Sequence, residues 1–173
     1  MSDELAVALR EAAYLEGDFV LRSGKRSKYY LDKYRFETRP ELLRPIGERI
    51  AATVAEHAAD ATRLAGPELG AVALAASASL ASGMPFLIVR GAAKEYGTSN
   101  RIEGVFEPGE CVCVVEDVVT SGGQVVISTG ELRKLGAHVD HALCVIDRQE
   151  GGAEALAAEG IMLRALLTRA DLS

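Results

Sequence analysis

Strand-like segments alternate with segments of helical periodicity along most of this chain, and that alternation restricts its fold more than any other feature. A continuous apolar run at 111–115 is typical of a strand buried on both faces, and further strand-like segments lie at 85–89, 141–146 and 161–167. A shorter run at 63–65 completes the set, and helical repeats separate the runs. Regular alternation of this kind predicts an α/β fold, with a central parallel sheet flanked by helices on both faces.

The best-marked helix begins near residue 40. Thr38 and Glu41 have the spacing of a capping box, and Pro40 lies in the first turn. Apolar residues then recur at helical spacing, at Leu43, Ile46, Ile50 and Val54. Further helices are predicted at the amino terminus, before Ser82, over 124–135 and near 154–158.

The first forty or so residues fall outside this alternation. They hold two short extended segments, 19–21 and 29–31, separated by a turn at Gly24. We expect one domain over residues 1–173. In it, a small N-terminal hood of about residues 1–37 covers an α/β core of residues 38–173.

Composition excludes several classes of protein. Hydrophobic residues make up 49% of the 173 positions, enough for a core without disulfides or a structural metal. The net charge of 19 − 25 = −6 argues against a nucleic-acid binder. No apolar run reaches the ~20 residues that cross a bilayer, and the acidic amino terminus does not resemble a secretory signal. We therefore expect a cytoplasmic protein with neither a nucleic-acid nor a membrane partner.

One stretch, VCVVEDVVTSGGQ at residues 112–124, carries the chemistry. An apolar strand leads into Glu116 and Asp117, and a hydroxyl- and glycine-bearing turn follows at the start of a predicted helix. Backbone N–H groups at a helix amino terminus bind anions. The carboxylates would repel a phosphate, but they could hold sugar hydroxyls or Mg²⁺ with its waters. The stretch indicates a sugar-phosphate site; alternatively, the acids end a strand and the glycines only form a turn.

The same stretch resembles the motif with which type I phosphoribosyltransferases bind phosphoribosyl diphosphate (PRPP), with Gln124 where a small residue is usual. The resemblance implies the type I phosphoribosyltransferase fold. It places Glu116 and Asp117 at the ribose hydroxyls and the following turn around the 5′-phosphate. The remaining PRPP-binding residues that it implies here are Val118, Val119, Thr120, Ser121, Gly122, Gly123 and Gln124.

Three further segments resemble one group within this family, the orotate phosphoribosyltransferases. They are FVLRSG at 19–24 with Ser27 and the tyrosines at 29–30 after it, RGAAKEYG at 90–97, and IDRQE at 146–150. The resemblance implies transfer of a phosphoribosyl group from PRPP to orotate. The products would be orotidine 5′-monophosphate and diphosphate, within pyrimidine (UMP) biosynthesis.

The resemblance also implies that residues 90–103 form a catalytic loop. Lys94 would stabilise the departing diphosphate, with Arg90 and Tyr96 as partners, and Arg22 would add a positive charge at PRPP. The catalytic set is then Lys94, Arg90, Glu116 and Asp117. Gly91 stands where the family commonly has a lysine, so we expect one diphosphate contact fewer. The turn at 66–70 fits the family's glycine turn facing diphosphate, without side-chain assignments.

Orotate, a planar anion, would be bound by Tyr30, Leu31, Thr120 and Arg148. An alternative role for Arg148 is an ion pair with Asp147 or Glu150 at the end of a strand.

The resemblance implies Mg²⁺ as cofactor, held mainly by PRPP and water, so no protein residue is assigned as a metal ligand. It also implies a homodimer in which the 90–103 loop is shared across subunits. Two alternatives to the orotate activity stay open at this point. One is a phosphoribosyltransferase for a purine base, which the tyrosines and Arg148 disfavour. The other is a non-catalytic PRPP-sensing regulator, which the acidic composition disfavours.

Overall fold

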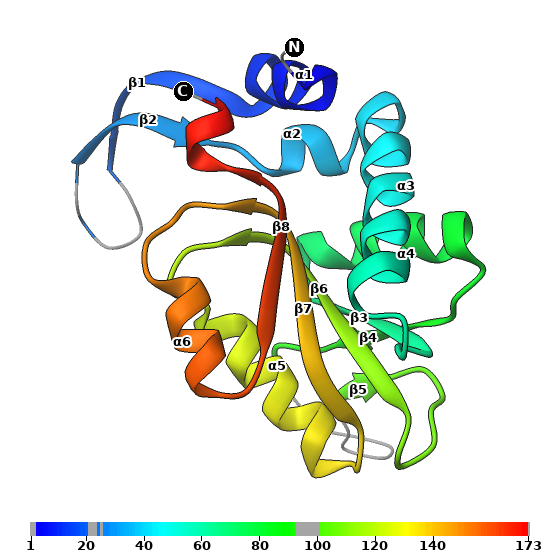
Figure 1. Ribbon diagram of the computed structural model, residues 1–173. Helices are drawn as coiled ribbons and strands as arrows, with labels where there is room; N and C mark the ends of the chain where they lie inside the picture. The colour runs from blue at the N-terminus through cyan, green and yellow to red at the C-terminus, as the bar shows by residue number, and fades with distance from the viewer. Residues whose placement is uncertain (1–2, 21–23, 25, 93–100, 173) are drawn as a thin grey trace.

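A six-stranded sheet lies between two layers of helices in the computed structural model, which describes residues 3–20, 24, 26–92 and 101–172 (Figure 1). Within these residues the strand order is β5-β4-β3-β6-β7-β8. The strands are β3 Arg63–Pro67, β4 Phe86–Val89, β5 Ile102–Glu103, β6 Cys111–Val119, β7 His138–Asp147 and β8 Met162–Thr168. All neighbours pair in parallel except β4 and β5. The predicted α/β fold is thus confirmed.

Helices cover both faces of the sheet, as the alternation predicted. On one face lie α3 (Pro40–His57) and α4 (Gly70–Ser82), and on the other α5 (Gly123–Lys134) and α6 (Gly152–Ala158) (Figure 1). The sequence did not predict β5, which pairs antiparallel with the end of β4 inside the polar 90–103 segment. Two residues are too few to show a strand period, so backbone pairing alone marks this strand.

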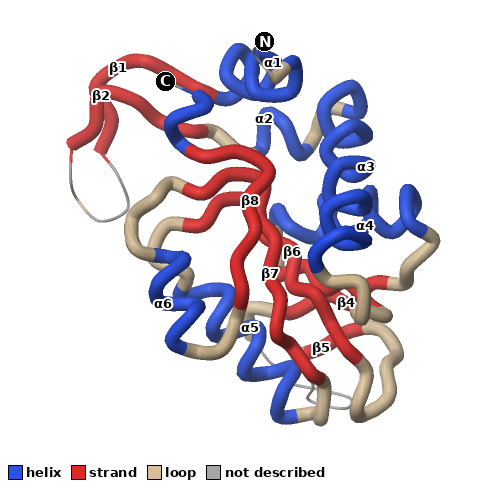
Figure 2. The backbone as a smooth tube through the Cα atoms, viewed as in Figure 1, coloured by secondary structure: helices blue, strands red, loops and turns tan. Residues whose placement is uncertain are grey.

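The amino-terminal residues form α1 (Glu4–Ala13), the antiparallel strands β1 (Tyr14–Val20) and β2 (Arg26–Leu31), and the short helix α2 (Tyr34–Glu37). These elements lie at the end of the sheet toward which β6 and β7 run (Figure 2). A carboxy-terminal 3-10 helix, η1 (Arg169–Leu172), follows β8 and packs against α1. Strand β1 begins at Tyr14, earlier than the predicted 19–21.

The prediction that Thr38 and Glu41 form a capping box at the start of α3 is wrong. The residue before the helix is Arg39, and no side chain caps the helix end. The Thr38 hydroxyl instead donates a hydrogen bond to the Tyr34 carbonyl at 2.6 Å. The reason is that α2 ends immediately before α3, so Thr38 completes the last turn of α2.

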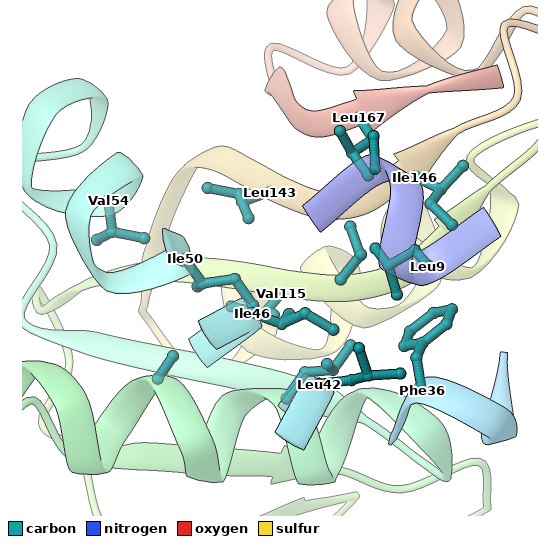
Figure 3. Close-up of a cluster of buried hydrophobic side chains, with 14 of the residues drawn as sticks. Leu9, Phe36, Leu42, Ile46, Ile50, Val54, Val115, Leu143, Ile146 and Leu167 are labelled. Atoms are coloured by element: carbon teal, nitrogen blue, oxygen red, sulfur yellow. The ribbon is translucent and has the colours of Figure 1, made fainter. Parts of the chain in front are cut away.

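Two aliphatic cores follow from the alternation of side chains along β6. Cys113 and Val115 face α3 and α4, whereas Val112 and Val114 face α5 and α6. The first core also contains side chains of α1, α2 and α3, so it joins the amino-terminal elements to the sheet (Figure 3). Among the described residues, no helix has the length and apolarity needed to span a membrane.

The contact between α3 and α4 supplies a test of the fold. A Cβ atom on Gly47 would lie 2.7 Å from the Ser77 carbonyl carbon, whereas one on Gly130 in α5 would meet nothing within 4 Å. We expect Gly47→Ala to lower the free energy of unfolding by about 1–3 kcal/mol, because the two helices would be forced apart. Gly130→Ala, the matched control, should raise it by up to ~1 kcal/mol. Urea unfolding measures both, and equal stability of the two variants would contradict this helix contact.

Candidate active site

The turn that follows β6 encloses a hollow of about 80 Å³ at the carboxyl end of the sheet. Gly122 precedes α5 with a φ of 79°, a left-handed conformation that glycine adopts without strain. Gly152 packs so closely on this turn that a Cβ atom there would lie 2.6 Å from the Thr120 carbonyl oxygen. The hollow is lined by Glu116, Val118, Val119, Thr120, Ser121, Gly122, Gly123, Gln124 and Val125. Most of the motif predicted from the sequence therefore surrounds one concave site.

Both motif acids lie within β6 rather than beyond it, because the strand continues to Val119 instead of ending near residue 115. Glu116 is 7% exposed and Asp117 3% exposed. Glu116 Oε1 accepts a hydrogen bond from the Asp117 backbone N–H at 3.0 Å. Side chains alternate along a strand, so Glu116 lines the hollow while Asp117 lies on the opposite face of β6.

On that face Asp117 meets two residues that the sequence analysis missed. Lys33, just before α2, donates a hydrogen bond from Nζ to Asp117 Oδ2 at 2.6 Å. Glu37, in α2, is 3% exposed, and neither of its carboxyl oxygens has a hydrogen-bond partner in the described part of the chain. A Cβ atom on Gly70, the first residue of α4, would lie within 2.6 Å of both the Glu37 and the Asp117 carboxyls. Only glycine fits there.

This carboxyl cluster, Glu37, Glu116 and Asp117, favours protonation. Burial, reinforced by the charge of Asp117, raises the pKa of Glu37 to about 8. Burial and Asp117 also raise the pKa of Glu116 to about 8. Burial disfavours the charged form of Lys33, but the hydrogen bond and charge of Asp117, together with the charges of Glu37 and Glu116, outweigh burial and raise the Lys33 pKa. At neutral pH the cluster therefore carries fewer negative charges than its three carboxyls suggest.

A second pocket lies between the hairpin and the ends of β7 and β8. Tyr29 stacks on Tyr14 with ring centroids 5.1 Å apart, and its hydroxyl accepts a hydrogen bond from Arg148 Nη2 at 3.1 Å. Arg148 also pairs with Glu150 at 2.9 Å, as the alternative reading of the sequence foresaw. The pocket, with a volume of about 60 Å³, is lined by Tyr14, Tyr29, Leu31, Ile146, Arg148, Arg169 and Leu172.

The four predicted orotate-binding residues are divided between different surfaces. Leu31 and Arg148 line the second pocket, and Thr120 lines the hollow after β6. Tyr30 lies on the other face of β2, where it packs against Phe19 with ring centroids 5.6 Å apart. Tyr29 takes the place next to Arg148. The alternation of β2 could have revealed this, since residues 29 and 31 share one face.

Residues 90–92 and 101–103 form the described base of the predicted catalytic loop, and several contacts fix it. Arg101 Nη2 donates to the Gly91 carbonyl at 2.6 Å, and Arg101 Nη1 lies 3.4 Å from Glu131 Oε1 in α5. The Gly91 backbone N–H donates to Glu68 Oε2 at 2.9 Å. Glu68 belongs to the predicted diphosphate turn at 66–70. That turn therefore contacts both the loop base and, through Gly70, the carboxyl cluster.

Arg90 stays at this loop base, where its guanidinium lies 3.5 Å from Glu103 and donates to the Ala92 carbonyl at 3.4 Å. Lys94, Tyr96 and Arg22, also predicted for the site, lie outside the described residues. Among the described residues, no group of three or more His, Cys, Asp or Glu side chains is placed to hold a metal ion.

Known proteins resemble this chain over nearly its whole length. It is 48% identical over 173 residues to the orotate phosphoribosyltransferase of Methanocella arvoryzae, covering 99% of this chain and 97% of that protein. Crystal structures of Mycobacterium tuberculosis orotate phosphoribosyltransferase match it with TM-scores of 0.88 for the complex with Fe(III) dicitrate and 0.83 for the complex with PRPP. Their identities are 32% and 31%; each match covers 98% of this chain, and 97% and 96% of theirs. No family model matches the chain.

The raised pKa values predict how stability depends on pH. A carboxyl whose folded-state pKa exceeds its unfolded value stabilises the fold below the unfolded value, and this stability is lost as pH rises through the folded value. We therefore expect the melting temperature to fall between about pH 5 and pH 8. Glu37→Gln cannot titrate and should show a shallower fall, whereas Glu11→Gln, at an exposed carboxyl of α1, should match wild type. Calorimetric melting at several pH values tests this, and equal slopes for all three proteins would contradict it.

Proposed function

The chain belongs to the orotate phosphoribosyltransferases, enzymes of pyrimidine biosynthesis that transfer the phosphoribosyl group of PRPP to orotate, and we propose how its residues divide that reaction. The observation that carries the proposal is the hollow after β6, where a carboxylate and an anion-binding turn share one concave surface. The 5′-phosphate of PRPP binds to the turn of residues 120–123. Backbone N–H groups and the hydroxyls of Thr120 and Ser121 supply its donors.

The ribose then lies over the end of β6. Glu116 receives a sugar hydroxyl from within the hollow, and Asp117, the other acid of the motif, receives the second hydroxyl. The diphosphate extends toward the turn at 66–70. The crystallised complex of the Mycobacterium tuberculosis enzyme with PRPP supports PRPP as the ligand.

Transfer breaks the bond between the anomeric carbon and diphosphate while orotate N1 attacks that carbon. The sugar then resembles an oxocarbenium ion, as in glycoside cleavage, and negative charge develops on the departing diphosphate. Cations near the departing diphosphate lower this barrier. Arg90 and Lys94 supply them in the proposal, with Tyr96 as a partner and Arg22 as a further charge at PRPP. Gly91 adds no cation. The diphosphate therefore has one contact fewer than in family members that have a lysine at this position.

Orotate binds on the hairpin side. Arg148 presents a guanidinium whose Nε is buried without a hydrogen-bond partner among the described residues, so it has a donor to offer a planar anion. Leu31 lines the same pocket, and Thr120 and Tyr30 complete the proposed set. The small volume of this pocket implies that Tyr29 or the Arg148–Glu150 pair moves when orotate enters.

Mg²⁺ accompanies PRPP as part of the substrate in this proposal. When bound, it neutralises charge on the diphosphate. The Glu116 carboxyl fits such an ion, because it lines the same hollow as the turn of residues 120–123 and offers the oxygen donors that Mg²⁺ prefers. This chain's residues then orient the sugar and leave the metal to phosphate oxygens and water.

The active form is a homodimer in the proposal. An apolar groove between α3 and α4 supports it, with Leu80 89% exposed at its edge. The position of the loop base supports sharing of the loop between subunits. Arg101 contacts Glu131, eight residues along α5 from Gly123 and therefore about 12 Å from the hollow. Three free cysteines support a reducing, cytoplasmic location.

Substrate specificity tests the assignment of Arg148. Wild-type protein with PRPP and Mg²⁺ should consume orotate and leave hypoxanthine and adenine unchanged. The loss of orotate absorbance measures the reaction. Arg148→Met should lower kcat/KM for orotate by about 10- to 100-fold, because a charge-assisted hydrogen bond contributes about 1.5–3 kcal/mol. The KM for PRPP should change little.

Arg164→Met serves as the control, since Arg164 is an exposed arginine of β8. If Arg148→Met and Arg164→Met have the same kcat/KM for orotate, Arg148 is not an orotate ligand and serves only its contacts with Glu150 and Tyr29.

A further inference from the structure

Glu37 is a buried carboxyl to which the proposed reaction assigns no role. It is 3% exposed, and neither oxygen receives a hydrogen bond from a donor in the described part of the chain. Leaving a buried carboxyl without partners is costly unless it is protonated or serves another group. The preceding residue, Phe36, is fully buried in the first core, so α2 holds Glu37 in place (Figure 3).

The neighbour of Glu37 is Asp117, since a Cβ atom on Gly70 would lie within 2.6 Å of both carboxyls. Two carboxyls at this separation are stable when they share one proton, since one then donates to the other. Asp117 Oδ1 accepts from the Val118 backbone N–H at 2.6 Å, and Oδ2 accepts from Lys33. Glu37 and Lys33, both residues of the hood, thus fix the position of the Asp117 carboxyl.

The position of Asp117 also affects Glu116, because the Asp117 backbone N–H donates to Glu116 Oε1. A shift of Asp117 would therefore move the carboxyl that lines the hollow. Since β2 leads directly to Lys33, this chain of contacts connects the hairpin carrying Tyr29 and Leu31 to the end of β6.

The groups that face the Glu37 carboxyl are known from each element packed against it. β6 presents Asp117, with the charge of Glu116 acting from the other face of the strand, and the turn before α2 presents Lys33. α4 presents its amino-terminal backbone at Gly70. α1 and α3 contribute the apolar side chains Leu9, Leu42 and Ile46 to the adjacent core.

We infer that Glu37 is a positioning residue for phosphoribosyl transfer: by sharing a proton with Asp117 it fixes both acids of the sugar site and ties them to the hood. This inference rests on the proposed role of Asp117 and Glu116 at the ribose. Glu37 itself does not touch the substrate. Its pKa near 8 supports a proton on the pair at neutral pH.

Two substitutions separate positioning from simple packing. Glu37→Gln keeps the shape and can still donate a hydrogen bond to Asp117, whereas Glu37→Leu fills the space without one. Both remove a buried carboxyl, which favours folding, so melting temperatures should stay at or above that of wild type. Glu11→Gln is the control for an exposed hood carboxyl.

Steady-state kinetics with PRPP and orotate, measured from pH 6 to pH 10, provide the test. Glu37→Gln should retain most of the activity at pH 7. Glu37→Leu should lose about tenfold or more in kcat/KM for PRPP, because misplacing a reacting group by ~1 Å costs up to about 100-fold. Wild-type activity should fall as pH rises through about 8, as Glu37 loses its proton and repels Asp117, and this fall should be smaller in Glu37→Gln.

Equal kcat/KM values for Glu37→Leu and Glu37→Gln, in folded proteins beside an active wild type, would overturn the inference and leave the proposed function intact. A wild-type protein that does not turn over orotate with PRPP would overturn both. A role in packing alone would change melting temperatures but neither the KM for PRPP nor the pH profile.

Discussion

Burial of carboxyl groups at the end of a central strand is the constraint on which the rest of this site depends. Glu116 and Asp117 lie in β6 between two layers of helices, where a bare negative charge is strongly disfavoured. Their environment compensates in three ways: a lysine beside Asp117, backbone donors within β6, and a third carboxyl, Glu37, whose raised pKa favours its neutral form. Two of these three compensating groups come from the amino-terminal elements, outside the sheet.

The parallel sheet explains why those elements lie there. Parallel strands end at one edge, and the turns after them gather the polar groups of the site. Covering that edge with the hairpin and α2 removes the carboxyls from water and raises the pKa values of Glu37 and Glu116. The first core, which packs α1, α2 and α3 on β6 and β7, fixes the cover (Figure 3). Fold and electrostatics are therefore linked through Phe36 and Glu37, which are neighbours in sequence.

The α/β alternation and the motif at 112–124 could be predicted because each depends on local sequence: apolar runs for buried strands, glycines and hydroxyls for an anion-binding turn. The cluster around Asp117 could not, since Lys33 and Glu37 reach it across about 80 residues of chain and neither has a local signal. Two other features could not be predicted for a related reason. Pairing with β4 decides the two-residue strand β5, and the neighbouring helix α2 decides the role of Thr38. Tyr29 was within reach of the sequence, through the alternation that it shares with Leu31.

The most direct test of this account is a crystal structure of the chain with PRPP and Mg²⁺ bound. The account predicts ribose hydroxyls within about 3.2 Å of the Glu116 and Asp117 carboxyls and the 5′-phosphate on the backbone of residues 120–123. It also predicts that Glu37 keeps its contact with Asp117 in that complex. A sugar bound elsewhere, or one that leaves both acids without a hydroxyl, would contradict it.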